Sequence, residues 1–246
     1  RLVAQRRPDR IVGFGGYGSV PVVLAGYLRR VPVFIHEQNA SAGRANRFLG
    51  RLARGIMVSF PGSARVFPKA KVTVTGYPLR QFSQALPREA CLNEFGMQAG
   101  VVTVAVCGGS QGSRTLNQIA VQTAGLLRAK TEVQILHITG KQDEEIVRMG
   151  YERLGIRHQV FPFFHEMEKI YRSADVMIAR AGAGLIHEIL YFGIPAVIVP
   201  YPYAGAHQKW NAAAFVREGR GLMIEEKYLT AQRLCGEIMN LLNHQG

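Results

Sequence analysis

Residues 101–117 read Val-Val-Thr-Val-Ala-Val-Cys-Gly-Gly-Ser-Gln-Gly-Ser-Arg-Thr-Leu-Asn, an apolar run that ends in a glycine-rich turn and continues into a helical pattern. A short apolar run bounded by glycine predicts a buried strand, and the pattern over 113–128 predicts a helix. A second helical pattern covers 207–218, and further apolar runs rich in Val and Ile lie at 10–14, 32–36, 71–75, 133–138, 157–161, 175–179 and 195–200. Strands that alternate with helices indicate βαβ units and parallel sheets, so we expect an α/β fold.

The length of 246 residues, with 48% hydrophobic and 19% charged residues, fits a globular chain of one large or two modest domains. Residues 76–88 contain two prolines and show no clear period. We therefore expect a linker there between two doubly wound domains, an N-terminal domain over 1–79 and a C-terminal domain over 80–246.

The three cysteines stand far apart without a CxxC pair, which favours a reducing compartment over a disulfide framework or a zinc site. The longest uncharged stretch, 11–28, contains five glycines and Pro21. These residues predict a strand, a loop and a helix rather than a membrane span, so we expect a soluble chain. Because the chain opens at Arg1 without Met, we interpret it as a segment of a longer protein.

The net charge of +13 is concentrated in the first part of the chain. Residues 1–98 contain 15 Lys and Arg against 4 Asp and Glu, whereas residues 99–246 contain 15 against 13. A solvated basic face, an anionic membrane surface, a phosphate-bearing substrate and nucleic acid would each fit. Nucleic acid fits least, because no zinc-finger or RNP-like motif is present and the basic residues are scattered among apolar helices.

Three glycine-rich turns, at 15–19, 108–112 and 182–184, each follow an expected strand and open an expected helix. Backbone N–H groups of such turns can approach an anion, and the helix N-terminus adds a partial positive charge. Glycine also serves close packing of strand and helix, so one turn alone leaves both interpretations open. Three turns at the carboxyl ends of strands favour ligand sites at a cleft between domains.

The P-loop motif GxxxxGK[ST] and the zinc motif HExxH are both missing from the sequence. The only Asp residues are Asp9, Asp143 and Asp175, so no Asp-x-Asp metal motif is possible. A nucleotide diphosphate held without metal, by helix N-termini and an occasional Arg, fits best. Glu188, four residues after Gly184, could accept hydrogen bonds from both ribose hydroxyls, or could act as a helix-dipole partner.

The run Gly108-Gly109-Ser110-Gln111-Gly112 through Leu116-Asn117 closely resembles the GGSQG signature of the MurG family, the lipid I N-acetylglucosaminyltransferases of peptidoglycan synthesis. Matching segments follow in the family's order at 15–17, 36–39, 76–80, 180–188, 193–195 and 207–212. The resemblance covers nearly all of the chain. The family's N-terminal GGTGGH loop does not occur in it, and the C-terminal helix looks truncated, so we expect a fragment.

The resemblance implies a GT-B architecture, two Rossmann-like domains facing across a cleft. It implies inverting transfer of GlcNAc from UDP-GlcNAc to the C4 hydroxyl of MurNAc in lipid I, with no cofactor. The implied location is peripheral, on the anionic cytoplasmic face of the bacterial inner membrane. Two rival hypotheses remain: another GT-B enzyme, such as a UDP-GlcNAc epimerase or a lipid glycosyltransferase, and a non-catalytic nucleotide-sugar-binding subunit.

The resemblance also implies roles for individual residues. Glu37 and His36 are local candidates for the catalytic base, since the family's usual base is a His in the GGTGGH loop. Leu185 and His187 replace polar positions of the family's third glycine loop, which puts side-chain contacts there in doubt. The implied substrate-binding residues are Asn39, Arg80, Ser110, Gln111, Phe164, Ala183, Gly184, Leu185, Ile186, His187, Glu188, His207 and Gln208, and the implied acceptor loop is Gly15, Gly16 and Tyr17, with no metal ligand.

Overall fold

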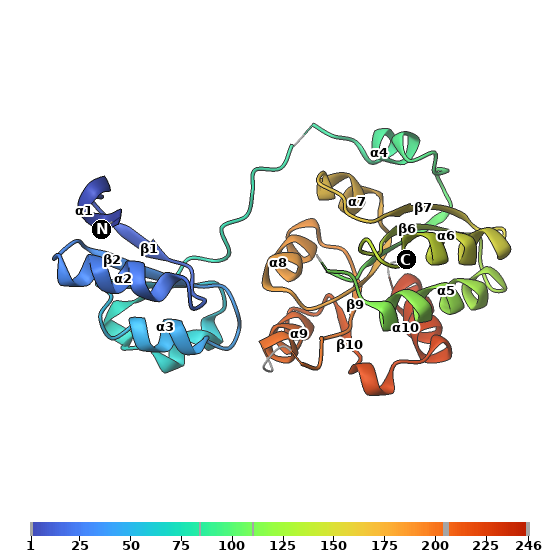
Figure 1. Ribbon diagram of the computed structural model, residues 1–246. Coiled ribbons are helices and arrows are strands. Elements are labelled where there is room, and N and C mark those ends of the chain that lie inside the picture. The colour runs from blue at the N-terminus through green and yellow to red at the C-terminus, as the bar shows by residue number, and fades with distance from the viewer. Residues whose placement is uncertain (1, 84, 110, 204–206, 245–246) are drawn as a thin grey trace. The chain divides into compact units, whose positions relative to one another are not determined.

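The computed structural model describes residues 2–83, 85–109, 111–203 and 207–244 (Figure 1). It separates into two compact units. The first unit comprises Arg1–Leu79 together with Tyr203–Ala214, and the second comprises Arg80–Pro202 together with Phe215–Gly246.

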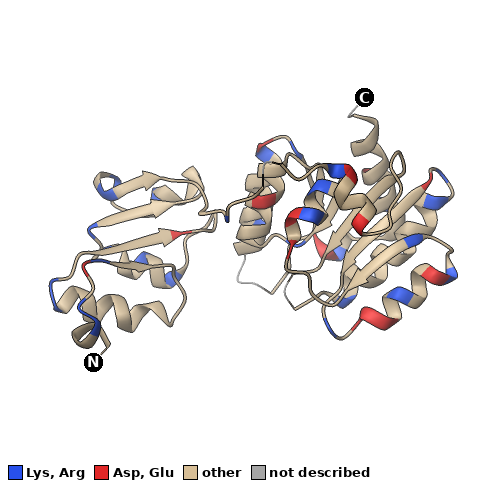
Figure 2. Cartoon of the chain, turned by 90° about the horizontal axis from the view of Figure 1, so that it is seen from above, with Lys and Arg blue, Asp and Glu red and all other residues tan. Residues whose placement is uncertain are grey.

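The first unit contains a parallel sheet of order β1-β2-β3-β4. Its elements are α1 (Leu2–Arg6), β1 (Ile11–Gly13), α2 (Ser19–Leu28), β2 (Val33–Glu37), α3 (Arg44–Leu49), β3 (Gly55–Val58), the 3-10 turns η1 (Pro61–Val66) and η2 (Lys69–Lys71), and β4 (Val72–Val74). Helix α2 packs tightly on the sheet, because a Cβ on Gly26 would lie 2.4 Å from the side chain of Ile11. Lys and Arg far outnumber Asp and Glu on this unit, which carries the N-terminus (Figure 2).

The second unit contains a six-stranded parallel sheet of order β10-β9-β8-β5-β6-β7. Its elements are α4 (Arg88–Glu94), β5 (Val102–Cys107), α5 (Arg114–Arg128), β6 (Val133–Ile138), α6 (Glu144–Arg153), β7 (Arg157–Phe161), α7 (Met167–Ser173), β8 (Val176–Ala179), α8 (Ala183–Phe192), β9 (Ala196–Ile198), β10 (Gly221–Met223), η3 (Glu226–Tyr228) and α10 (Ala231–Asn243), while α9 (His207–Arg217) begins among the residues of the first unit. The strand order reverses between β5 and β8, which makes this pair the topological switch point.

Alternation along the strands shows that helices cover both faces of the second sheet. Val104 and Val106 of β5 belong to a core shared with α5, α6 and α10. Ala105, which is also fully buried, points to the opposite face, where α7 contacts β5 and packs against α4 and α8. The predicted α/β class with parallel sheets is therefore confirmed, and the second sheet is doubly wound as predicted.

Two strands differ from the sequence-based prediction, which had not included β3 and β10. Both are short and begin with glycine. Gly221 opens β10 where a Cβ would lie 2.0 Å from the Ala196 carbonyl oxygen, so pairing with β9, rather than local propensity, decides that strand.

Among the helices of the described residues, none combines the length and apolar character needed to cross a bilayer.

Candidate functional site

The switch point of the second sheet brings two of the predicted glycine turns together. The turn 108–112 follows β5 and opens α5, and the turn 182–184 follows β8 and opens α8. Because β5 and β8 are adjacent parallel strands, the N-termini of both helices lie at the same edge of the sheet. The first-turn N–H groups of two helices there form a place suited to an anion.

Close packing fixes the turn after β5. Gly112 has a φ of +73°, and a Cβ on it would lie 2.1 Å from the carbonyl oxygen of Thr139. Glycine is therefore required at this position by backbone packing, the alternative left open by the sequence. Gln111 is exposed beside it, whereas the predicted site residue Ser110 lies outside the described residues.

Arg180 joins the two turns, a role that the sequence alone did not assign to it. It directly follows β8, is 5% exposed, and its backbone N–H donates to the Cys107 carbonyl at 3.1 Å. Its guanidinium donates to the hydroxyl of Ser113, to the carboxylate of Glu226 and to the carbonyl of Val199. Since Ser113 caps the N-terminus of α5, Arg180 ties that helix start to β8.

Glu188 and Arg80, predicted for ribose and diphosphate, meet in an ion pair. Both Nε and Nη2 of Arg80 donate to Glu188 Oε1, at 3.2 and 3.0 Å. The other carboxylate oxygen accepts a hydrogen bond from the hydroxyl of Tyr171. Burial, and after it the charge of Glu188, raises the pKa of Tyr171, so this hydroxyl stays protonated and donates.

The start of α8 presents mainly its backbone. Gly182 caps the helix in an extended conformation, and Ile186 is fully buried in the core. Ala183, Gly184, Leu185 and His187 are partly buried along the same turns. Of the predicted residues on this helix, Ile186 can therefore reach a ligand only through its backbone.

Phe164 lies in an aromatic cluster. Its ring centroid is 4.7 Å from that of Phe161 and 5.5 Å from that of Phe95. This geometry supports a packing role for the ring, and leaves the backbone of Phe164 available to contact a nucleobase.

In the first unit, Glu37 is a buried carboxylate with four hydrogen-bond donors. Oε1 accepts from the backbone and side-chain nitrogens of Asn39 at 2.9 and 3.1 Å. Oε2 accepts from the backbone of Gly43 at 3.0 Å and from Asn46 Nδ2 at 2.9 Å. Four donors use the acceptor sites of a carboxylate, and they fix the segment that follows β2. The geometry therefore fits a positioning role better than that of a base.

His36, the other local candidate for the base, is 4% exposed and lies against Phe14, with ring centroids 5.6 Å apart. Its Nε2 is 3.1 Å from the carbonyl oxygen of Gly76. An imidazole whose Nε2 donates to a backbone carbonyl oxygen is held for structure.

A cavity of about 380 Å³ in the first unit gathers several predicted residues. His207 Nδ1 lies 3.1 Å from the Ser41 carbonyl oxygen, and Asn211 donates to Asn39 Oδ1 at 3.1 Å. Gln208 lies beside His207 in the first turn of α9. Lining residues that were predicted as site residues are Gly15, Gly16, Tyr17, Glu37, Asn39 and His207.

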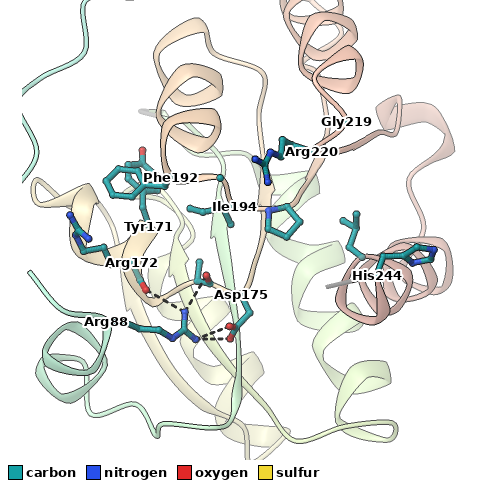
Figure 3. Close-up of a pocket in the computed structure, with 13 residues that line it drawn as sticks. Arg88, Tyr171, Arg172, Asp175, Phe192, Ile194, Gly219, Arg220 and His244 are labelled. Atoms are coloured by element: carbon teal, nitrogen blue, oxygen red, sulfur yellow. Dashed lines mark hydrogen bonds and ion pairs between the residues drawn. The ribbon is translucent and has the colours of Figure 1, made fainter. Parts of the chain in front are cut away.

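A second cavity, of about 500 Å³, is lined by Asp175, Ile194 and Arg220 (Figure 3). These residues precede β8, β9 and β10, so the cavity lies at the amino ends of these strands, whereas the glycine turns follow carboxyl ends. The Arg88 guanidinium there pairs with both carboxylate oxygens of Asp175 at 2.8 Å. None of the predicted site residues lines this cavity, so it is separate from the switch point.

No group of three or more His, Cys, Asp or Glu is placed to hold a metal ion within the described ranges.

Two family models match the chain. Residues 103–245 match the glycosyltransferase family 28 C-terminal domain, and residues 1–58 match the N-terminal domain of the same family. The chain belongs to glycosyltransferase family 28. The matched C-terminal part contains the switch point, its two glycine turns and Glu188.

Individual proteins within this family show which of its members the chain resembles. The chain is 38% identical to the UDP-N-acetylglucosamine--N-acetylmuramyl-(pentapeptide) pyrophosphoryl-undecaprenol N-acetylglucosamine transferase of Moorella thermoacetica, over 98% of this chain and 67% of that protein. The crystal structure of Acinetobacter baumannii MurG is similar at 32% identity with a TM-score of 0.80, over all of this chain and 69% of that one. The chain spans about two thirds of the length of the curated relatives it matches.

The fold itself is shared more widely. The crystal structure of the glycotransferase of kitacinnamycin has a TM-score of 0.70 at only 16% identity, over 98% of this chain and 69% of that one. At that identity the likeness shows the fold alone.

Proposed function

We propose that this chain acts as an inverting glycosyltransferase that moves GlcNAc from UDP-GlcNAc to the C4 hydroxyl of MurNAc in lipid I, forming lipid II for peptidoglycan. One observation carries the proposal: two helix N-termini meet at the switch point with Arg80 and Glu188 in the same unit. The 38% identity to a transferase of this name supports the choice of substrates.

The leaving UDP needs positive electrostatics, which the second unit can supply without a metal. The β-phosphate of UDP would face the N-termini of α5 and α8, whose partial positive charges stabilise the departing diphosphate. Arg80 would move from Glu188 to the diphosphate, because half of its side chain is exposed and the ion pair holds it weakly. Glu188 would then accept hydrogen bonds from the ribose hydroxyls, which would take the place of Arg80.

The acceptor hydroxyl would approach from the residues around the cavity of the first unit. Glu37 holds Asn39 there, and the space beside Gly16 is open, since a Cβ on it would meet no atom within 4 Å. Inverting attack requires a base to take the hydroxyl proton. The four donors on Glu37 favour positioning, so we assign the base to neither Glu37 nor His36.

The basic first unit supports a peripheral location on the anionic cytoplasmic leaflet, where a lipid-linked acceptor resides. Residues 1–79 contain 13 Lys and Arg against 2 Asp and Glu. At the end of α2, the side chain of Leu28 is 79% exposed and is followed by Arg29 and Arg30. An exposed apolar side chain beside cations fits the interface of such a membrane.

Calorimetry with UDP-GlcNAc, combined with a radiolabel transfer assay on a lipid I analogue, tests the proposal. We expect the 246-residue chain to bind UDP-GlcNAc and to transfer it slowly. The family's candidate base lies in a GGTGGH loop that residues 1–246 do not contain, and loss of a general base typically costs about 10²- to 10⁴-fold in rate. Absence of UDP-GlcNAc binding, or consumption of the nucleotide sugar without any acceptor, contradicts the proposal.

A further inference from the structure

We propose that His137, a buried residue of β6, is a positioning residue for the glycine turn 108–112 at the switch point. It acts through Asn117 of α5 and through the carbonyl group of Thr139. The inference rests on the proposed function, because that turn is where the diphosphate of the sugar donor would bind.

The hydrogen-bond partners of His137 fix its tautomer. Asn117 Nδ2 donates to the Thr139 carbonyl at 3.0 Å and to the Asp143 carboxylate at 2.9 Å. The other end of that amide, Oδ1, is therefore an acceptor, and it lies 3.0 Å from His137 Nε2. Nε2 must carry the imidazole proton, and Nδ1 accepts from the hydroxyl of Tyr151 at 2.9 Å. The chain of donors runs in one direction, from Tyr151 through His137 and Asn117 to Thr139.

The donors and acceptors from Tyr151 to Thr139 are inside the protein. His137 and Tyr151 are fully buried, and Asn117 is 1% exposed. Burial lowers the pKa of His137 to about 3, so the ring is neutral at physiological pH and keeps a single donor. An imidazole with one donor and one acceptor, each used, orients Asn117 in one way only.

The Thr139 carbonyl group, which accepts a hydrogen bond from Asn117, packs directly against the glycine turn. A Cβ on Gly112 would lie 2.1 Å from the Thr139 oxygen, and a Cβ on Gly140 would lie 2.9 Å from the Gln111 oxygen. The backbones of 111–112 and 139–140 are thus in direct contact, with no side chain between them. A small rotation of the Thr139 peptide would displace the turn, because nothing flexible separates the two.

The network has no other use in the proposed mechanism. Its side chains are not among the residues that the proposed function assigns to the substrates, and the neutral His137 is separated from the turn by Asn117. Its effect on the sugar donor must therefore pass through the position of the backbone at 111–112, which is measurable.

Two substitutions of His137 form a matched pair. In His137→Gln the side-chain amide can reach the place of Nε2 and still donate to Asn117. In His137→Asn the shorter amide reaches only the place of Nδ1, so the Asn117 oxygen loses its donor. Thr123→Val is a control on α5, the helix that carries Asn117. It removes one buried hydrogen bond, from the Thr123 hydroxyl to the Ile119 carbonyl at 2.7 Å, away from the turn.

The experiment measures UDP affinity by calorimetry, amide hydrogen exchange of Gly112 without ligand, and the thermal midpoint. We expect His137→Asn to weaken UDP binding about tenfold, the size of one unsatisfied buried hydrogen bond, and to speed exchange at Gly112. His137→Gln should stay within about threefold of the unsubstituted chain, since it keeps that bond, and Thr123→Val should lower only the midpoint.

Equal UDP affinity and equal Gly112 exchange in the two His137 variants overturn the positioning role, whatever their midpoints. If the unsubstituted chain does not bind UDP but Gly112 exchange still separates the two variants, the proposed function fails and the positioning role stands.

Discussion

Replacing Glu188 by Gln tests the assignment of this carboxylate to the uridine ribose. In the ligand-free chain the carboxylate is 13% exposed and accepts from Arg80 and Tyr171. Glutamine has nearly the same shape and can keep its carbonyl oxygen toward one of these donors. Because Arg80 is half exposed, losing the ion pair should cost about 0–1 kcal/mol of folding stability.

The loss in UDP binding should be larger than the loss in stability. A hydrogen bond to a charged group contributes about 1.5–3 kcal/mol, so UDP affinity should fall roughly ten- to 150-fold. Binding of 2′-deoxy-UDP, which lacks one of the two hydroxyls, should fall less. Titration calorimetry with both ligands measures the difference.

Glu168→Gln is a matched control for this measurement. Glu168 is 17% exposed and pairs with Arg172 at 3.0 Å in the same unit, but lies outside the proposed site. Its substitution should leave UDP affinity unchanged. If UDP and 2′-deoxy-UDP weaken equally in Glu188→Gln, or if Glu168→Gln weakens UDP as much, the ribose assignment is wrong.

Three further predictions concern metal, pH and the membrane. UDP binding should be unchanged by EDTA, since helix N-termini and Arg80 supply the positive charge; affinity lost on EDTA and restored by magnesium would contradict this. The folded-state pKa of His137 is lowered to about 3, so below about pH 6.5 the unfolded chain binds one more proton than the folded chain. His137 therefore lowers the free energy of unfolding as pH falls. Urea unfolding should therefore show the unsubstituted chain losing about 2 kcal/mol more than His137→Gln between pH 7.5 and pH 5, and parallel pH profiles would show that His137 titrates normally. The chain should sediment with vesicles more as anionic lipid increases and less as salt increases; salt-insensitive or absent sedimentation would leave the basic charge as a solubility feature.

Much of the fold class could be predicted from local sequence pattern. Apolar runs and glycine turns mark where β5 and β8 end and where α5 and α8 begin. Such boundaries can be predicted because the hydrophobic periodicity of a strand or helix is a property of residues adjacent in the sequence. Strands β3 and β10 were missed because each begins with glycine, which leaves only a short local apolar run. Strand β10 has only three residues, and its existence depends on the partner strand β9.

Some residues of the candidate site could likewise be predicted from local sequence, whereas the burial of others could not. Glu188 and the glycine turns could be found from their place after strands, and the motifs at 108–117 and 180–188 indicated the family. The sequence did not indicate that Ile186 faces the core. Helix α8 is apolar on several sides, and only packing decides which side is buried.

What the sequence by itself determined about this protein is the order of most of its strands, the place of its glycine-rich turns and its family. The tertiary structure alone decided which distant polar groups meet. Arg80 is 108 positions from Glu188, and His137 reaches Asn117 from another element. Such pairs depend on how crossover helices return strands to one sheet, and a buried polar group must find its partner wherever the fold places one.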